Sequence, residues 1–140
     1  MTEATVWKWF SKFIRLRDSY ELNGELVADC CTCGKTVSLM TRQGWSPDLH
    51  AGHFISRNNK STKYDEQNVH SQCITCNTFH AGNQFEHGLF IDKKYGPGTA
   101  EKILIKSKQL CKRNRYDLKV LADYYREESK KLASQLGVKL

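Results

Sequence analysis

Two Cys-x-x-Cys pairs, separated by about forty residues, constrain this 140-residue chain more than any other feature. Cys30 pairs with Cys33, and Cys73 pairs with Cys76. Each such turn presents two thiolates at the spacing that tetrahedral Zn²⁺ requires, so two turns complete a four-thiolate site. A closed site of this kind leaves no coordination position for water or substrate. The sequence therefore predicts a structural zinc ion that ties two distant segments together.

Two further cysteines, Cys31 and Cys111, remain outside this set. Cys31 is an alternative ligand to Cys30, although only one residue would then separate it from Cys33, which is shorter than the usual zinc spacing. The N-terminal segment "MTEATVWKWF" is amphipathic and lacks the apolar run of a signal segment. We therefore expect a cytoplasmic protein whose cysteines bind metal rather than form disulfides.

The charge balance favours a polyanionic partner. Lysine and arginine number 22 against 15 acidic residues, a formal net charge of +7. Nucleic acid and an anionic membrane surface both attract such a chain, but no long apolar span or lipid signal is present. We therefore expect nucleic acid and no membrane partner. The alternative is that the excess charge only keeps the surface solvated.

The length predicts a single domain over residues 1–140. Apolar residues at helical spacing predict an amphipathic helix over residues 4–20 and two helices within residues 99–136. Between them, residues 30–83 have the short apolar runs and turn residues of a small mixed core. The predicted fold class is therefore α+β, with a zinc-stapled core flanked by helices on both sides.

Within that core, the sequence predicts two strands at residues 36–40 and 49–56, joined as a hairpin through "QGWSPD". The segment 68–80, "NVHSQCITCNTFH", has the length and composition of a short helix. So small a hairpin and helix bury too little apolar surface to be stable alone, and a bound metal would supply the missing folding energy.

Histidine and asparagine residues cluster around the two cysteine pairs. Hydrolysis of a phosphodiester needs a base that activates water and a divalent ion that offsets charge on the phosphate. His53 is the candidate base, and His50 and Asn77 are candidate ligands of the ion. His80 follows Asn77 by three residues, on the same face of a helix, and is a further candidate. The alternative for each histidine alone is a purely structural role.

Basic residues in two segments are candidates for DNA contacts. The polar face of the predicted N-terminal helix carries Lys8, Lys12 and Arg15, and the loop "SRNNKSTKYDE" carries Arg57, Lys60 and Lys63. The alternative is again a solvated surface without a ligand.

Five segments, in this order, carry a resemblance to a known family: "WFSKFIRLRDS", "CCTCGK", "HAGHFISR", "YDEQNVHSQCITCN" and "AGNQFEHGLFIDKKYG". Together they resemble the bacteriophage NinG/Rap family of recombination endonucleases, which carries an HNH or ββα-metal nuclease motif. The resemblance extends from about Trp7 to about Tyr125.

The resemblance implies roles for individual residues. It makes His53 the general base, Asn68 a bracing residue and Asn77 a ligand of a catalytic Mg²⁺ or Mn²⁺, and it makes the four paired cysteines the structural zinc ligands. Where the family usually has Asp, this sequence has His50. Because imidazole suits softer ions, this departure predicts a shift from Mg²⁺ toward Mn²⁺ or a later transition metal.

The implied function is cleavage of branched recombination intermediates, such as Holliday junctions and D-loops, by a phage-encoded enzyme in the cytoplasm of its bacterial host. A non-catalytic zinc-ribbon module that binds DNA is the main alternative, and a nuclease acting on RNA is another. Paired cuts in a junction need two active centres, so we expect a homodimer. A candidate contact is the apolar stripe of the C-terminal helix; otherwise the stripe covers the chain's own core. It comprises Leu118, Leu121, Tyr125, Leu132 and Leu136.

Overall fold

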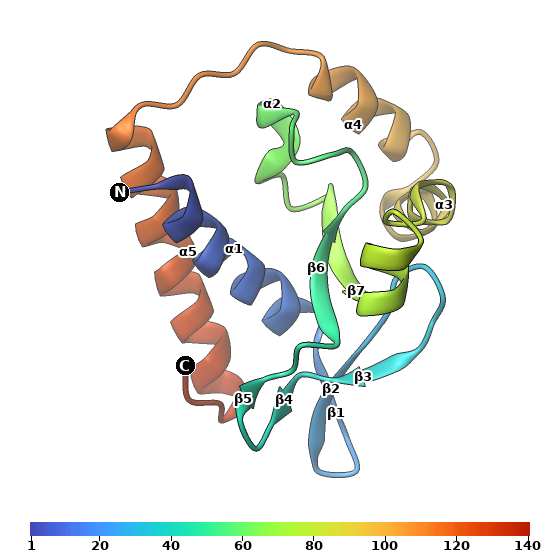
Figure 1. Ribbon diagram of the computed structural model, residues 1–140, viewed down its shortest axis with the longest axis vertical. Helices are drawn as coiled ribbons and strands as arrows, with labels where there is room; N and C mark the ends of the chain where they lie inside the picture. Colours follow the sequence, from blue (N-terminus) through green and yellow to red (C-terminus); the bar gives the residue numbers. More distant parts are fainter.

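Helices and short antiparallel strands alternate in the computed structural model, which describes residues 1–140 (Figure 1). The helical elements are α1 (Glu3–Asp18), α2 (Lys60–Lys63), η1 (Thr75–Phe79), α3 (Gln84–Tyr95), α4 (Thr99–Ser107) and α5 (Arg115–Leu136). The strands are β1 (Tyr20–Leu22), β2 (Glu25–Asp29), β3 (Thr36–Ser38), β4 (Met40–Thr41), β5 (Gly44–Trp45), β6 (Leu49–His53) and β7 (Val69–Cys73). The predicted α+β class is confirmed.

The strands form three small antiparallel sheets with the orders β1-β2-β3, β4-β5 and β6-β7. Asn23 and Gly24 both adopt positive φ, 52° and 79°, in the turn between β1 and β2. Such a pair matches the twist of a two-residue hairpin, and asparagine and glycine tolerate this conformation better than other residues. In the β6–β7 hairpin His50 lies opposite Gln72, and Gly52 lies opposite His70.

The strand pairing in the core differs from the prediction. Residues 36–38 pair with β2 rather than with β6, and the segment expected to begin a helix at residue 68 instead forms β7, the true partner of β6. All five residues of β7 are buried. A strand covered on both faces lacks alternating polarity, so its sequence cannot be distinguished from a buried helix by periodicity. Only the single π-helical turn η1 remains of the expected helix.

The flanking helices are largely where the sequence places them. The expected helix 4–20 is α1, and the expected pair within 99–136 is α4 and α5. Asn114 caps α5 in a capping box with Asp117. The helix α3 was not predicted, because its residues show little amphipathic pattern. None of the helices combines the length and apolar character needed to cross a bilayer.

The main core lies between α1, α5 and the β6–β7 hairpin, with α3 and α4 on the opposite side of the hairpin (Figure 1). Leu118 and Tyr125 of α5 are buried in it, and Leu121 and Leu132 pack against it. Leu132 and Leu136 also contact a second core, formed around the cysteines. The apolar stripe of α5 therefore covers the chain's own core, the alternative to the dimer contact described above.

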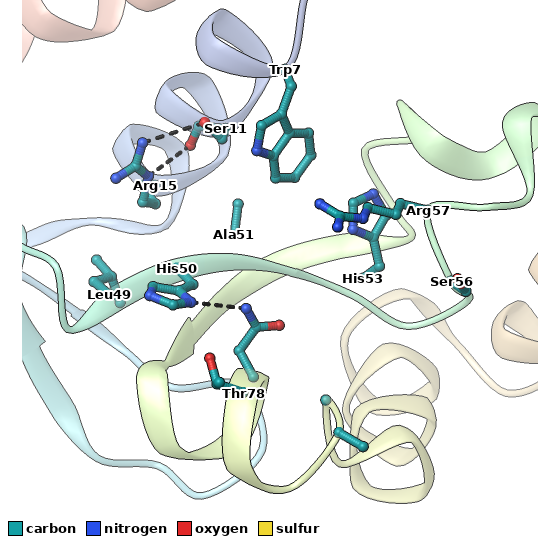
Figure 2. Close-up of a pocket in the computed structure, with 13 residues that line it drawn as sticks. Trp7, Ser11, Arg15, Leu49, His50, Ala51, His53, Ser56, Arg57 and Thr78 are labelled. Carbon is teal, nitrogen blue, oxygen red and sulfur yellow. Dashed lines mark hydrogen bonds between the residues drawn. The ribbon is translucent and has the colours of Figure 1, made fainter. Parts of the chain in front are cut away.

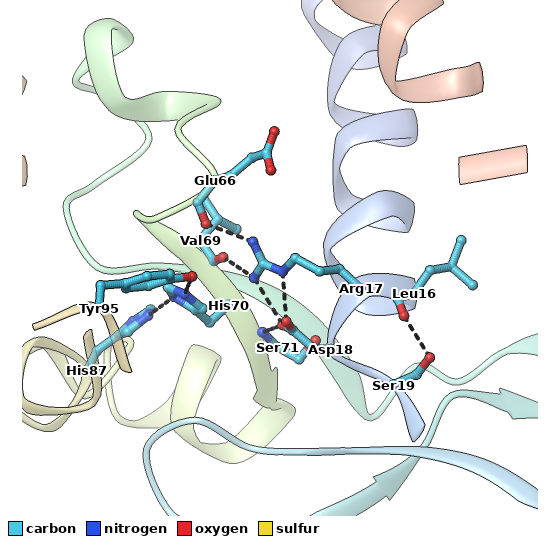
Figure 3. A network of polar contacts seen from close by, with 10 residues as sticks. All are labelled: Leu16, Arg17, Asp18, Ser19, Glu66, Val69, His70, Ser71, His87 and Tyr95. Atoms are coloured by element: carbon cyan, nitrogen blue, oxygen red, sulfur yellow. Dashed lines mark hydrogen bonds and ion pairs between the residues drawn. The ribbon is translucent and has the colours of Figure 1, made fainter. Parts of the chain in front are cut away.

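A buried polar network joins α1, β7 and α3 (Figure 3). Arg17 donates to the carbonyl oxygens of Glu66 and Val69 at 2.8 and 2.9 Å. His70 contacts His87 at 3.0 Å and the hydroxyl of Tyr95 at 2.8 Å. Burial lowers the pKa of His70 to about 2 and that of His87 to about 4, so both imidazoles are neutral in the folded protein.

Candidate active site and metal centre

The four paired cysteines converge at one point between two turns. Cys30 and Cys33 lie on the turn after β2, and Cys73 and Cys76 flank the start of η1. The four sulfur atoms all lie within 4.8 Å of one another, and those of Cys33 and Cys73 are 3.7 Å apart. Tetrahedral zinc with Zn–S bonds of about 2.3 Å needs sulfurs about 3.8 Å apart. The geometry therefore fits a structural zinc ion held by the predicted residues.

Cys31 and Cys111 are not part of this cluster. The backbone N–H of Cys31 donates to the carbonyl of Ser71, and burial raises the pKa of its thiol well above the usual value. Cys111 lies in the connection between α4 and α5. Cys30, and not Cys31, therefore belongs to the cluster that could bind zinc.

A polar cleft of about 720 Å³ opens beside β6 (Figure 2). The α1 residues Trp7, Ser11 and Arg15 form one wall, and η1 with the loop after it forms the other. Its lining residues are Trp7, Ser11, Arg15, Leu49, His50, Ala51, His53, Ser56, Arg57, Asn77, Thr78, Ala81 and Gly82. The cleft brings together the sequence-predicted residues His50, His53 and Asn77.

The free edge of β6 faces this cleft. Phe54 donates to the carbonyl of Asn68, and Ile74 donates to that of Asp48, each at 2.8 Å. Because hydrogen-bonded residues alternate along an antiparallel pair, the N–H and C=O groups of Ala51 and His53 point away from β7. The backbone N–H and C=O groups of these two cleft residues are therefore not used in the β6–β7 pairing.

His50 and Asn77 form a pair inside the cleft (Figure 2). Nε2 of His50 donates to the carbonyl of Pro47 at 3.0 Å, which leaves a lone pair on Nδ1. Asn77 donates its side-chain N–H to that lone pair at 2.9 Å. The side-chain oxygen of Asn77 makes no hydrogen bond. A candidate nitrogen ligand on β6 and a candidate oxygen ligand on η1 are therefore adjacent, with the nitrogen engaged by the Asn77 N–H.

Gly52 makes room for this pair. A Cβ at this position would lie 1.8 Å from the side-chain oxygen of Gln72 and 3.0 Å from that of Asn77. Gln72 is fully buried, its side-chain N–H donates to the carbonyl of Gly82 at 2.8 Å, and its side-chain oxygen has no partner. The glycine of "HAGH" is thus required by close approach. Sequence reasoning missed Gln72, whose only signal is its position beside Cys73.

His53 is held with one ring nitrogen free. Its Nε2 donates to the carbonyl of Lys63 at 2.9 Å, and its ring stacks on Trp7 with 5.0 Å between centroids and 22° between planes. Nδ1 makes no hydrogen bond and carries the lone pair. Burial, together with the charges of Arg57 and Lys63, lowers the pKa of His53 to about 4, against the opposing effect of the hydrogen bond to the Lys63 carbonyl. The imidazole is therefore neutral at physiological pH and able to accept a proton.

Asn68 braces the segment that orients His53. Its side chain is fully buried, donates to the carbonyls of Ile55 and Thr62 at 3.0 Å each, and accepts from the N–H of Ile55 at 2.8 Å. Thr62 immediately precedes Lys63, whose carbonyl holds the ring of His53. Asn68 thus lies away from the cleft, in the position of a bracing residue.

His80 does not line the cleft, unlike the other candidate ligands. It is exposed and follows the last residue of η1. The expectation that it shares a face with Asn77 assumed an α-helix, whereas the wider π turn rotates a residue three positions on to a different side. His80 is therefore not brought to the His50–Asn77 pair.

The predicted DNA-contacting residues separate into three groups. Arg15 and Arg57 line the cleft. Lys8 and Lys12 lie on the neighbouring face of α1. Lys60 is exposed on α2, and Lys63 forms an ion pair with Glu3 at 3.1 Å.

Two arginines, Arg15 and Arg57, are the charged residues of the cleft. No aspartate or glutamate lines it. Arg15 donates only to the carbonyl and hydroxyl of Ser11, and burial lowers its pKa to about 10. Two guanidinium groups without an acidic partner are suited to hold a phosphate.

The candidate ligand atoms in the cleft indicate which divalent ion it would hold. An imidazole nitrogen of His50 and an amide oxygen of Asn77 would suit a first-row transition ion such as Mn²⁺ better than Mg²⁺, with water and phosphate oxygens in the remaining positions. Mg²⁺ prefers oxygen ligands and is usually held by one or two carboxylates, which this cleft lacks. A histidine at position 50, where the family usually has Asp, would therefore favour Mn²⁺ over Mg²⁺.

The comparisons with known proteins give the family. The chain matches the family model described as Bacteriophage Lambda NinG protein over residues 2–135. No curated protein and no solved structure is significantly similar to it. A match over nearly the whole chain includes the cysteine cluster and all residues of the cleft, and on this match the chain belongs to the bacteriophage lambda NinG family.

Proposed function

We propose that this protein is a metal-dependent endonuclease that cleaves branched DNA, such as Holliday junctions and D-loops, during phage recombination. The observation that carries the proposal is the arrangement of the cleft. A neutral histidine with a free Nδ1 shares it with a nitrogen–oxygen ligand pair and two unpaired arginines. The family supports the recombination context.

The roles of the residues follow from their contacts. Arg15 and Arg57 bind the phosphodiester, and its negative charge offsets the cations that lower the pKa of His53, so His53 becomes a stronger base when substrate is bound. His53 Nδ1 takes a proton from the water that attacks phosphorus, while Lys63 and Trp7 hold the ring in place. A divalent ion at His50 and Asn77 would offset charge on the phosphate and leaving oxygen. A zinc ion held by Cys30, Cys33, Cys73 and Cys76 would fix η1, and with it Asn77, against β6.

The alternative is a non-catalytic DNA-binding module stapled by zinc. Such a module needs the cysteines and basic residues, but it needs no partner-free imidazole nitrogen in the cleft. The arrangement of His53 therefore favours the enzyme over this alternative.

The test is cleavage of a four-way junction, a linear duplex, single-stranded DNA and RNA by the purified protein with Mn²⁺ or Mg²⁺. We expect the junction to be cut, and we expect His53→Ala to retain junction affinity while cleavage falls by about 10² to 10⁴-fold. His80→Ala, at an exposed histidine outside the cleft, is the matched control and should cut normally. Junction binding without cleavage in any metal would favour the non-catalytic module, and cleavage of RNA alone would favour the RNA nuclease.

A further inference from the structure

A second basic surface adjoins the cleft, built from three segments distant in sequence. This indole–cation surface consists of Lys8, Trp9, Lys12 and Arg15 of α1, Trp45 of β5 and Arg126 of α5. Trp9 has Lys8, Lys12 and Arg126 over its ring, at 5.3, 5.0 and 5.9 Å from the centroid. Trp45 has Lys12 and Arg15 over its ring, at 5.7 and 4.5 Å. Two indoles thus gather four cations on one face.

These four cations have no acidic partner. The ion pairs of the chain involve Arg17, Lys63, Lys106, Lys119, Lys130 and Lys131, none of which belongs to the indole–cation surface. Burial lowers the pKa of Lys12, and the like charges of Lys8 and Arg15 lower it further. Crowded like charges destabilise the free protein, and a polyanion laid across them would relieve the repulsion.

The surface is continuous with the cleft but faces another direction. Arg15 belongs to both, since it lines the cleft and its guanidinium carbon lies 4.5 Å from the centroid of the Trp45 ring. Successive residues of a helix with 3.6 residues per turn point about 100° apart. Ser11 faces the cleft, so Lys12 faces a neighbouring side of α1. A backbone followed from the cleft past Arg15 must therefore turn around α1 to reach Lys12 and Trp9.

We propose that the indole–cation surface binds the phosphate backbone of a second DNA arm while the first arm occupies the cleft. This inference rests on the proposed function and adds to it the contact that would distinguish a branched substrate from a linear one. Cation–π contacts hold the lysine and arginine side chains over the indoles, which lowers the entropy lost when they bind phosphate. A straight duplex in the cleft would leave these cations unused, whereas two arms diverging at Arg15 would use both surfaces.

The test removes charge from this surface alone. The variant Lys8→Gln/Lys12→Gln/Arg126→Gln leaves every cleft residue intact. The matched control, Lys93→Gln/Lys102→Gln/Lys108→Gln, removes the same charge from exposed lysines on and beside α3 and α4. Affinity for a four-way junction and for a linear duplex of one arm is measured over a range of salt concentrations, and cleavage is measured in single turnover at saturating protein.

We expect the surface variant to bind the junction at least about tenfold more weakly than wild type. The slope of log affinity against log salt concentration should become shallower by about 2.7, because each of the three lost phosphate contacts contributes about 0.9. Duplex affinity should change less than about threefold, and the single-turnover rate should be unchanged. The control should behave as wild type. Unchanged junction affinity, equal losses for junction and duplex, or an equal loss in the control would each overturn the second arm site. If the wild type cuts no DNA, the proposed function fails instead, a result distinguishable from these.

Discussion

Asn77 donates its side-chain N–H to Nδ1 of His50 at 2.9 Å, and so occupies the lone pair that a metal ion would use. An ion bound by both residues must replace this hydrogen bond, with the amide turned so that its oxygen faces the ion. Metal binding thus competes with an existing contact and depends on how well the ion suits an imidazole ligand.

His50→Asp should change metal preference. A carboxylate supplies the hard oxygen ligand that Mg²⁺ prefers, so we expect the ratio of Mg²⁺-supported to Mn²⁺-supported cleavage to rise by about tenfold or more. Titration calorimetry with each ion gives a readout independent of activity and should show the same change in relative affinity. His80→Asp, which adds the same carboxylate outside the cleft, is the control. An unaltered preference in His50→Asp would mean that His50 is not a ligand.

The stacking of Trp7 on His53 predicts a change in the pH profile of cleavage. Trp7→Ala should expose the imidazole, so its pKa should rise from about 4 toward the ordinary value near 6.5. The acidic limb of the pH–rate profile should move upward with it, and the rate should fall about tenfold as the ring loses its orientation. Trp7→Phe keeps an aromatic partner and should lie close to wild type. An acidic limb that does not move in Trp7→Ala would show that another group limits the rate.

Asn68→Ala should destabilise the protein strongly. The change leaves the N–H and carbonyl of Ile55 and the carbonyl of Thr62 without partners in a buried site, at a cost of about 1 to 3 kcal/mol for each group. We expect the free energy of unfolding, from urea titration, to fall by at least about 3 kcal/mol. Asn58→Ala, at an exposed asparagine, should fall within about 0.5 kcal/mol of wild type.

How far the sequence predicts the fold depends on the element. The cysteine tetrad was predictable because zinc geometry restricts ligand type and spacing, and the helices α1 and α5 were predictable because each has one apolar face. The strand β7 was not, since burial on both faces removes its periodicity. His80 was misplaced for a separate reason, since the expected relation to Asn77 assumed an α-helix and η1 is a π turn.

The candidate site shows a similar division. His50, His53 and Asn77 were identifiable by residue type and position, and the structure brings them to one cleft. The contributions of Trp7 and Gln72 depend on contacts between segments far apart in the chain, which no local pattern reveals. The pairing of β6 with β7 places Gln72 opposite His50, and only after that pairing is known does the need for Gly52 become clear.

The zinc cluster predicts different outcomes for its cysteines. Cys73→Ser removes a ligand from the site that joins the β2–β3 turn to η1, so we expect loss of bound zinc and an unfolded or insoluble protein. Cys31→Ser should keep one zinc per chain, since Cys31 lies outside the cluster. Atomic absorption and thermal unfolding measure both. Retention of zinc by a folded Cys73→Ser protein, or its loss from Cys31→Ser, would show that the ligands are wrongly assigned.

The buried histidines predict that stability falls on acidification from pH 7 to pH 5. Folding lowers the pKa of His70 to about 2 and of His87 to about 4, while the unfolded chain titrates near 6.5. Below pH 6.5 the unfolded state therefore binds protons that the folded state does not, and each histidine reduces the free energy of unfolding by about 2 kcal/mol at pH 5. Urea titrations at several pH values should show this decline. His87→Gln should flatten the decline, because one buried titrating group is gone, whereas His80→Gln, at an exposed histidine, should leave the slope unchanged. An equally steep decline in His87→Gln would place the acid sensitivity in other groups.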